Sequence, residues 1–206
     1  MAAEISRDLI VDQLGDVTYN RFLFYIMGPY KSFNLSYVLS EEERQAIDID
    51  DLPGPLRRLF QNKAEIDGAQ ALLRRVQGSL RVNPGVNAFL ALDVDIPTSE
   101  VDAATQSIEF TKCSNATAFV LPFLGHNFGV GEEAGSILEA LSETHGDRLI
   151  FVHEDDVTSA MIRSARVRWD LRVETYDTEA DLVEKLRLFA GEIMHRERRG
   201  GLNRLD

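Results

Sequence analysis

A glycine-rich stretch with two adjacent carboxylates, NFGVGEEAG at residues 127–135, has the composition most suggestive of chemistry. It follows an apolar run that ends at Leu124 and precedes an amphipathic segment that begins at Ala134. Gly129 and Gly131 allow a ligand to approach the main chain, and a helix after them would offer free N–H groups. The stretch therefore predicts a ligand-binding turn between a strand and a helix.

The two acids of this stretch, Glu132 and Glu133, complicate its interpretation as a phosphate-binding turn and suit a different chemistry. They would repel a phosphate while stabilising the positive end of the helix. The glycine spacing also differs from that of a dinucleotide-binding fingerprint. A carboxylate at the mouth of a crevice suits attack on a sugar carbon that becomes oxocarbenium-like, or stabilisation of its charge. One aimed glutamate is therefore the candidate agent of glycosidic chemistry.

Polar residues elsewhere are weaker candidates. Asp95 precedes Ile-Pro and either binds the ligand or, as the preferred interpretation, caps the turn into the next helix. His126 titrates near neutrality, but a loop histidine is more often only solvated. The side chains of the run HEDD at 153–156 cannot all point one way, so we predict no metal site there. We also expect no cofactor.

Five apolar segments alternate with helical patterns, and this alternation predicts the fold class. The predicted strands are 21–27, 87–94, 117–124, 148–154 and 171–176. The predicted helices are 63–80, one from Ser99, one from Ala134, 158–165 and 179–195. Parallel strands need crossovers, which are right-handed. We therefore predict a three-layer, doubly wound α/β fold with a five-stranded parallel sheet in the flavodoxin-like order 2-1-3-4-5.

Two loops of unusual composition meet in this topology. The order reverses between the first and third strands, and ligands bind outside the carboxyl ends of strands at such a point. Gly28-Pro29-Tyr30 follows the first strand, and the 127–135 stretch follows the third. Tyr30 and Asn34 would offer a ring for a base and a donor for a phosphate or hydroxyl. A plain surface loop is an equal alternative.

YIMGPY at 25–30 and GVGEEAG at 129–135 carry a family resemblance. The first resembles the glycine-proline-aromatic loop of the nucleoside 2-deoxyribosyltransferase family, and the second resembles its Gly-Thr-x-x-Glu-x-Gly signature. The likeness spans most of residues 21–155 in order and spacing, with specific residues only in the two loops. It implies cleavage of the N-glycosidic bond of a nucleoside or nucleotide through a covalent intermediate on Glu133. It also implies a homo-oligomer, because a neighbouring subunit often completes the site in that family.

The resemblance also implies roles for further residues, and it has departures. Asn127 and Asn115 would position the sugar or base, and Gly28, Gly129 and Gly131 would shape the backbone. The family usually has aspartates where this chain has Asn127 and Ser114-Asn115, and an amide cannot supply a proton. Base exchange is therefore in doubt, while hydrolysis and ligand binding remain open.

Two alternative functions remain. A TIR-like domain uses one glutamate on a similar sheet to split the nicotinamide bond of NAD. A non-catalytic module that binds a nucleotide or a protein partner would fit the two asparagine departures, because one scaffold hosts many functions.

The charge balance bears on partners and location. The 34 acidic side chains outnumber 22 basic ones, for a net charge of -12, which argues against nucleic acid held through its phosphates. Only four of the cations are lysines, as in proteins of salt-accumulating microbes, although an ordinary acidic cytosolic protein is an equal alternative. No apolar run nears 18 residues and the first 20 residues are acidic, so we expect a cytoplasmic protein.

The length of 206 residues predicts one main domain. We expect an N-terminal helical lead over 1–20, a single α/β domain over 21–195 with a long connection at 28–63, and a disordered tail over 196–206. Cys113 is the single cysteine, and a structural thiol is the preferred interpretation.

Overall fold

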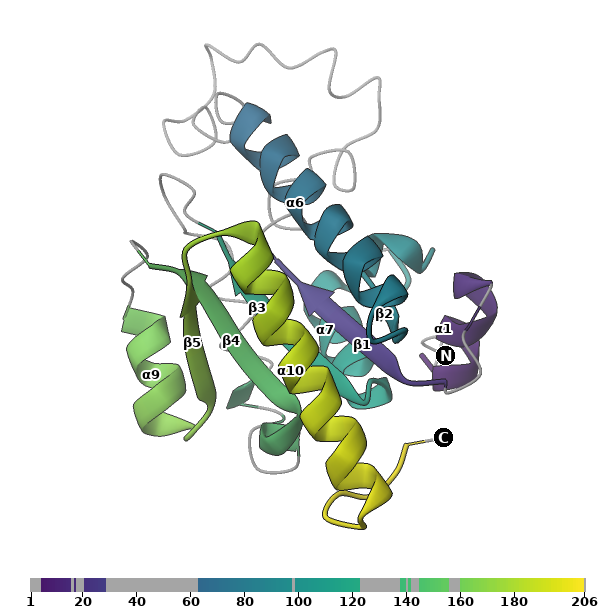
Figure 1. The fold of residues 1–206 in the computed structure, drawn as a ribbon. Coiled ribbons are helices and arrows are strands. Elements are labelled where there is room, and N and C mark those ends of the chain that lie inside the picture. Colours follow the sequence, from purple (N-terminus) through teal and green to yellow (C-terminus); the bar gives the residue numbers. More distant parts are fainter. Residues whose placement is uncertain are drawn as a thin grey trace, which may run out of the picture.

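A parallel sheet of five strands in the order β2-β1-β3-β4-β5 forms the centre of the protein (Figure 1). The computed structural model describes residues 5–15, 17, 21–28, 63–97, 99–122, 138–139, 141, 145–155 and 160–205. The strands are β1 (Leu23–Met27), β2 (Asn87–Phe89), β3 (Ala116–Leu121), β4 (Leu149–Glu154) and β5 (Arg172–Tyr176). The predicted fold class and strand order are confirmed.

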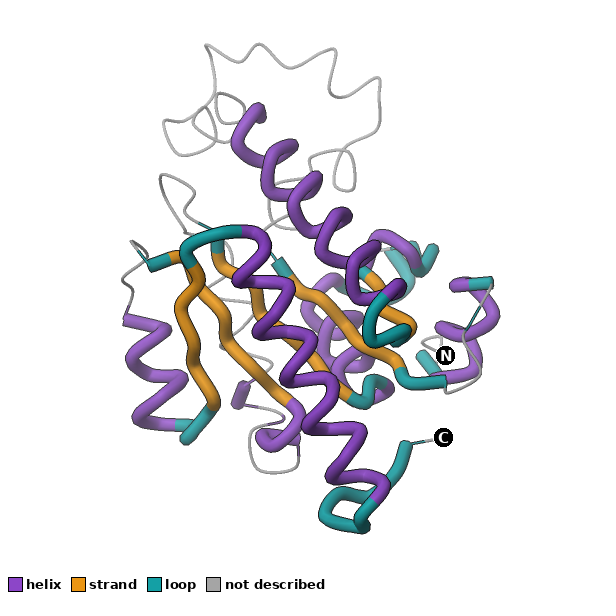
Figure 2. Tube along the Cα trace, in the orientation of Figure 1, coloured by secondary structure: helices purple, strands orange, loops and turns teal. Residues whose placement is uncertain are grey.

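Helices on both faces of the sheet make three layers (Figure 2). They are α1 (Arg7–Leu14), α6 (Lys63–Val82), α7 (Ala103–Cys113), α9 (Ala160–Arg168) and α10 (Glu179–Arg198), with 3-10 turns η2 (Ala91–Asp93) and η3 (Gly146–Arg148). Side chains alternate along a strand, so neighbours face opposite layers. Phe24 of β1 meets Phe189 of α10, with ring centroids 6.3 Å apart, whereas Tyr25 meets Phe110 of α7 at 5.6 Å. Within the part of the chain that is described, no helix combines the length and the apolar character needed to cross a bilayer.

Burial explains why the strands were recognisable. Every residue of β1, β2 and β3 is buried. A strand covered on both faces must be apolar almost throughout, and it therefore reads as a continuous hydrophobic run. Only Tyr176 of β5 is buried, and the charged Arg172 and Glu174 lie along this edge strand. Such charges discourage pairing with another chain.

The second strand is shorter than predicted, because its carboxyl end is turned by side-chain contacts. β2 ends at Phe89 rather than at residue 94. The Asp93 carboxylate accepts hydrogen bonds from the Leu90 N–H (2.8 Å) and from Gln77 Nε2 of α6 (2.6 Å), and these contacts fold the chain into η2. The apolar composition of the segment could not reveal this long-range contact with α6.

The following helix, α7, begins later than predicted, and three of its four buried residues are polar. It starts at Ala103 rather than Ser99, because Asp102 caps it through a 3.0 Å hydrogen bond from the Thr105 N–H. Its buried residues are Gln106, Ser107, Phe110 and Thr111, whereas Ala104 and Ile108 are only partly buried. Gln106 Nε2 donates to the carbonyls of Ile96 (3.0 Å) and Val101 (2.8 Å). A glutamine thus faces inward to hold the preceding loop.

The C-terminal segment is ordered through residue 205, contrary to the disordered tail expected over 196–206. α10 continues to Arg198, three residues past the predicted end at His195. Leu202 packs against the hydrophobic core. The carbonyls of Asn203 and Leu205 accept hydrogen bonds from Arg148 and Asn115. These hydrogen bonds fix the position of a segment whose composition alone predicts disorder.

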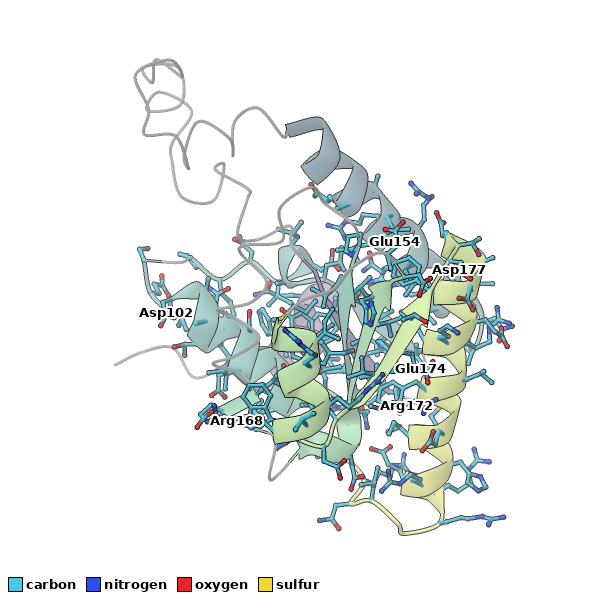
Figure 3. All side chains as sticks on the ribbon, turned by 90° about the vertical axis from the view of Figure 1, so that its left-hand side faces the viewer. Asp102, Glu154, Arg168, Arg172, Glu174 and Asp177 are labelled. Carbon is cyan, nitrogen blue, oxygen red and sulfur yellow. The ribbon has the colours of Figure 1, made fainter. Side chains whose placement is uncertain are left out.

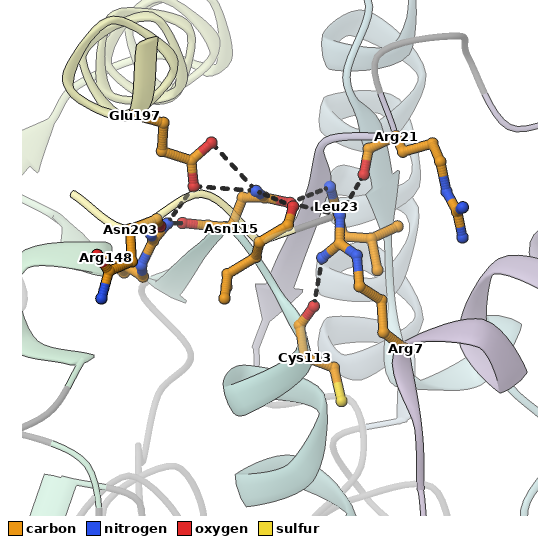
Figure 4. A network of polar contacts seen from close by, with 9 residues as sticks. Arg7, Arg21, Leu23, Cys113, Asn115, Arg148, Glu197 and Asn203 are labelled. Carbon is orange, nitrogen blue, oxygen red and sulfur yellow. Dashed lines mark hydrogen bonds and ion pairs between the residues drawn. The ribbon is translucent and has the colours of Figure 1, made fainter. Parts of the chain in front are cut away.

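A buried ion pair between Arg148 and Glu197 organises the amino end of the sheet (Figure 4). Arg148 Nη1 lies 2.6 Å from Glu197 Oε1, and their side chains are 8% and 7% exposed. The same nitrogen donates to the carbonyl of Asn115 at 2.7 Å, and Nη2 donates to that of Asn203. The guanidinium therefore joins β3, η3, α10 and the tail.

The side chain of Asn115 extends this network to the N-terminal helix. Its Oδ1 accepts from the Leu23 N–H (2.9 Å) and from Arg7 Nη2 of α1 (2.8 Å). Its Nδ2 donates to Glu197 Oε1 (3.0 Å) and to the Leu205 carbonyl (3.2 Å). Since Ile10 of α1 is also fully buried, the predicted lead over 1–20 contains a helix that packs on the domain core.

We expect Glu197→Ala to lower the free energy of unfolding by about 3–5 kcal/mol, because it leaves the Arg148 charge buried without its partner. Urea unfolding followed by circular dichroism measures this loss. Glu184→Ala, which removes an exposed ion pair with Arg187, is the control and should cost less than about 1 kcal/mol. Equal losses in the two variants would contradict the role given to the buried pair.

Candidate functional site

The five strands end at one edge of the sheet, here called the carboxyl edge. It is defined by the residue after each strand: Gly28, Leu90, Pro122, Asp155 and Asp177. β1 lies beside both β2 and β3, with Met27 paired to Phe119, so the strand order reverses between β1 and β3. This topology confirms the predicted switch point, which is where ligands bind in open α/β sheets. The chain leaves β1 at Gly28 and β3 at Pro122 on this edge.

Three of the ten predicted site residues are described, namely Gly28, Asp95 and Asn115. The other seven lie outside the described residues: Pro29, Tyr30, Asn34, Asn127, Gly129, Gly131 and Glu133. His126 also lies outside them. Leu138 and Leu141, which lie three positions apart after the glycine-rich stretch, are described and buried.

Gly28 is needed for the close approach of α6 to the end of β1. A Cβ atom added at Gly28 would lie 2.5 Å from Cδ1 of Leu73, and Leu73 is fully buried in the core. Carbon atoms in ordinary contact are about 3.5–4.0 Å apart, so a side chain at 28 would displace α6. The glycine therefore sets how closely α6 borders the switch point.

Asp95 does not cap the helix that follows. It lies two residues after η2 and is exposed, and its N–H donates to Gln13 Oε1 of α1 at 2.5 Å. The cap of α7 is Asp102, seven residues further along. The preferred interpretation, that Asp95 caps the turn before this helix, stays a prediction, because Thr98 of that turn lies outside the described residues. Its predicted contact with a ligand stays a prediction.

Asn115 lies at the opposite edge from Gly28. Its N–H donates to the carbonyl of Leu23, the first residue of β1, whereas Gly28 follows the last. Five residues of extended strand span roughly 16 Å. The structure therefore does not bring Asn115 and Gly28 together, and a position for Asn115 in the crevice is corrected. The reason is simple: in a parallel sheet, a residue that precedes a strand lies at the amino edge.

Acidic side chains gather where β4 and β5 end. Glu154 is paired in register with Tyr176, and Asp155 and Asp177 follow these two residues. Figure 3 shows Glu154 and Asp177 at the same end of the sheet. Asp155 and Asp177 are exposed, and neither forms an ion pair with another described residue. This part of the edge thus carries negative charge.

The hydroxyl group of Tyr176 is buried beside these acids. The residue is 4% exposed, and its hydroxyl finds no hydrogen-bond partner in the described part of the chain. Burial, and after it the charge of Glu154, raises the pKa of Tyr176. The hydroxyl therefore stays neutral and keeps its proton at physiological pH.

An ion pair between Arg75 of α6 and Glu179 of α10 connects the two helices near this edge. Arg75 Nε lies 3.1 Å from Oε1, and Nη2 lies 2.9 Å from Oε2. Hydrogen bonding to Glu179 raises the pKa of Arg75. A guanidinium whose Nε and Nη2 both donate to one carboxylate has fewer donors left for a ligand.

The imidazole of His153 and the thiol of Cys113 have local partners. His153 is buried, and its Nδ1 lies 2.9 Å from the carbonyl of Glu154. No group of three metal-type ligands is assembled among the described residues. Cys113 is half-buried, its Sγ lies 3.7 Å from the carbonyl of Ile5, and burial, followed by the charge of Glu109, raises the pKa of the thiol. These properties agree with a structural thiol rather than a nucleophile.

The sequence interpretation considered Asp155 only as part of the run 153–156 and did not consider Tyr176 or Asp177, although a signal was present. Each lies at or directly after the end of a predicted strand, as Gly28 does. All carboxyl ends of a parallel sheet share one edge, so the residues at the end of every predicted strand are equal candidates for a site at that edge.

A family model described as a domain of unknown function (DUF7509) matches residues 7–206. The chain belongs to this family. Neither the comparison with curated proteins nor that with solved structures gives a match. The match begins with the first residue of α1 and runs through the tail, so the DUF7509 domain includes both segments that were expected to flank it.

In this DUF7509 domain, Gly28→Ala should lower the free energy of unfolding by about 1–3 kcal/mol, because overpacking forces Leu73 to move. Urea unfolding measures the change. Gly78→Ala, with no atom within 4 Å of its added Cβ, is the matched control and should stabilise α6 by about 0.5–1 kcal/mol. The double variant Gly28→Ala/Leu73→Ala should lose less than the sum of its single changes. Strict additivity would show that the two residues do not meet.

Proposed function

We propose that this protein cleaves the N-glycosidic bond of a nucleoside or nucleotide, with Glu133 as the nucleophile or as the stabiliser of the oxocarbenium-like sugar carbon. The observation that carries the proposal is the reversal of strand order between β1 and β3. Gly28 and Pro122, the residues from which both unusual segments depart, lie on neighbouring strands at that reversal. Ligands bind at this position in sheets of this kind.

The geometry of Asn115 removes one objection to catalysis. Its amide accepts from Leu23 and Arg7 through Oδ1 and donates to Glu197 through Nδ2. An aspartate could not donate to the Glu197 carboxylate. Asparagine at position 115 therefore has a structural reason, and it does not indicate that the protein has lost catalytic activity. Asn127, outside the described residues, is the departure that still bears on proton transfer.

The proposed step has a defined electron and proton balance. The Glu133 carboxylate forms a bond to the anomeric carbon while the N-glycosidic bond breaks. The base leaves with the electron pair of that bond and takes a proton from solvent. Water then attacks the anomeric carbon, loses a proton and releases the carboxylate, which gives the free sugar. Transfer to a second base would replace water by a ring nitrogen in this last step.

The same proposal includes the substrate class, the location, the oligomeric state and the salt adaptation of the protein. The acidic charge balance supports a small-molecule substrate rather than nucleic acid, and a cytoplasmic location. The family resemblance supports a homo-oligomer in which a neighbouring subunit completes the site. The scarcity of lysine supports adaptation to high internal salt.

We expect Glu133→Gln to lower kcat at least about a thousandfold, because the amide is no nucleophile. The assay follows base release by chromatography from nucleosides, 2′-deoxynucleotides and NAD. Glu132→Gln, the same charge change one residue earlier, is the control and should retain activity within about threefold. Activity that survives Glu133→Gln would exclude the assigned role.

Other outcomes of this assay distinguish the competing functions. Release of nicotinamide from NAD alone would favour a TIR-like glycohydrolase. Nucleotide binding by calorimetry without turnover of any substrate would favour a non-catalytic module.

A further inference from the structure

We propose that the segment after α10, residues 199–205, is a strap whose docking at the amino edge of the sheet controls the order of α1. Through α1 it also controls the loop at residues 94–97, which belongs to the connection from β2 to α7. This inference goes beyond the function proposed above and does not depend on it, because it concerns the packing of the two chain ends.

The described contacts that hold the strap are mainly hydrogen bonds to its main chain. Its Asn203 carbonyl accepts a hydrogen bond from Arg148. Its Leu205 carbonyl accepts one from Nδ2 of Asn115 at 3.2 Å. Leu202 is only partly buried against the core. A segment with so little buried apolar surface opens at a much lower free energy than the core, so the strap can leave while the sheet stays folded.

Two glycines form a hinge at the start of the strap. α10 ends at Arg198, and Gly200 has a φ of 74°, a left-handed conformation that favours glycine. The Gly201 N–H closes the turn on the Arg196 carbonyl at 2.8 Å. Both glycines are exposed, and no described atom lies within 4 Å of a Cβ built at Gly200. Rotation at this point therefore meets no packed neighbour.

Asn115 connects the strap to α1 (Figure 4). Its Nδ2 donates to the strap and to Glu197, and its Oδ1 accepts from Nη2 of Arg7 at 2.8 Å. Both groups belong to one planar amide, so fixing the nitrogen also fixes the oxygen. Departure of the strap would admit water, which competes with Asn115 for the donors of Arg7. The contact between Asn115 and Arg7 therefore weakens when the strap leaves.

The order of α1 depends on such contacts. α1 has only eight residues, and isolated helices shorter than about 12–15 residues are marginal in water. Burial of Ile10 and a 2.6 Å hydrogen bond from Arg7 Nη1 to the Cys113 carbonyl also hold it on the domain. A weaker contact at Arg7 therefore shifts α1 towards an undocked state.

The last turn of α1 contacts the loop at residues 94–97. Gln13 Oε1 accepts from the Asp95 N–H at 2.5 Å. Arg7 and Gln13 are six residues apart, which is about 9 Å along a helix axis. The connection that contains Asp95 leaves β2 at the carboxyl edge, next to β1. α1 thus joins the buried network at the amino edge to a connection that starts at the opposite edge.

Hydrogen exchange of single amides in the full chain, followed by NMR, tests the inference. The protection factors to compare are those at position 202 in the strap, Ile10 in α1, Asp95 in the loop and Phe119 in the buried strand β3. Leu202→Ser should lower the first three by about three- to tenfold, because it removes the apolar side chain of the strap, and Phe119 should change by less than about twofold. Leu188→Ser, the same change at a side chain that is 59% exposed on α10, is the control and should leave all four within about twofold.

Two further variants locate the connection between the strap and the loop. Gln13→Ala removes its last contact, so protection at Asp95 should fall and no longer respond to Leu202→Ser, while Ile10 still responds. Arg7→Gln removes its first contact on α1, so Leu202→Ser should then add no further change at either amide.

Several outcomes would overturn the inference. One is a loss of protection at position 202 that leaves Ile10 and Asp95 unchanged, and another is an equal loss at Phe119, which would indicate unfolding of the whole domain. Gly200→Val places a β-branched side chain at a positive φ and releases the strap independently. Protection at position 202 that survives both this change and Leu202→Ser would show that the strap does not open separately, which also contradicts the inference.

Discussion

The buried ion pair between Arg148 and Glu197 is the interaction on which the amino edge of the sheet depends. A charge removed from water must be paired, and its remaining donors must be satisfied, or the folded state loses several kcal/mol. This requirement draws the carbonyls of Asn115 and Asn203 to Arg148. Asn115 in turn contacts Arg7. One pair thereby couples α1, β3, α10 and the C-terminal segment at a single edge.

The two edges of the sheet consequently differ in character. At the amino edge, the polar groups of Asn115, Arg148 and Glu197 bind one another and are buried. At the carboxyl edge, Asp155 and Asp177 are exposed to solvent. An edge whose polar groups are already satisfied within the protein offers little to a ligand, whereas exposed charges act on whatever approaches. This difference supports placing the proposed ligand site at the carboxyl edge.

The sheet could be predicted from sequence because its determinants are local. β1 and β3 are buried on both faces, so their apolar runs were unmistakable, and right-handed crossovers then limited the strand order. The errors arose where a distant side chain decides the outcome. Gln77 of α6 helps to end β2, and Arg148 orders the tail at Asn203. No periodicity within a segment records such partners.

The residues of the candidate site also differ in how well the sequence predicts their positions. Gly28 was predictable because composition and topology agreed at the end of β1, and the contact with Leu73 gives the glycine a steric reason. The family resemblance misplaces Asn115, because it matches residues in chain order and does not distinguish the amino end of a strand from its carboxyl end. The sequence alone makes this distinction, since Asn115 comes before the third strand and Gly28 comes after the first. Topological position is thus a stronger guide to a shared site than correspondence with a motif.

The use of arginine follows from the same need to join distant elements. Lys112 and Lys185, the lysines whose side chains are described, pair only with residues three or four positions away within their own helices. Arg75, Arg148 and Arg168 instead reach carboxylates at least 29 residues away. A planar guanidinium can hold a carboxylate through two parallel hydrogen bonds, which an ammonium group cannot do. Arginine thus supplies the described ion pairs that join distant elements, although Arg187 pairs locally with Glu184.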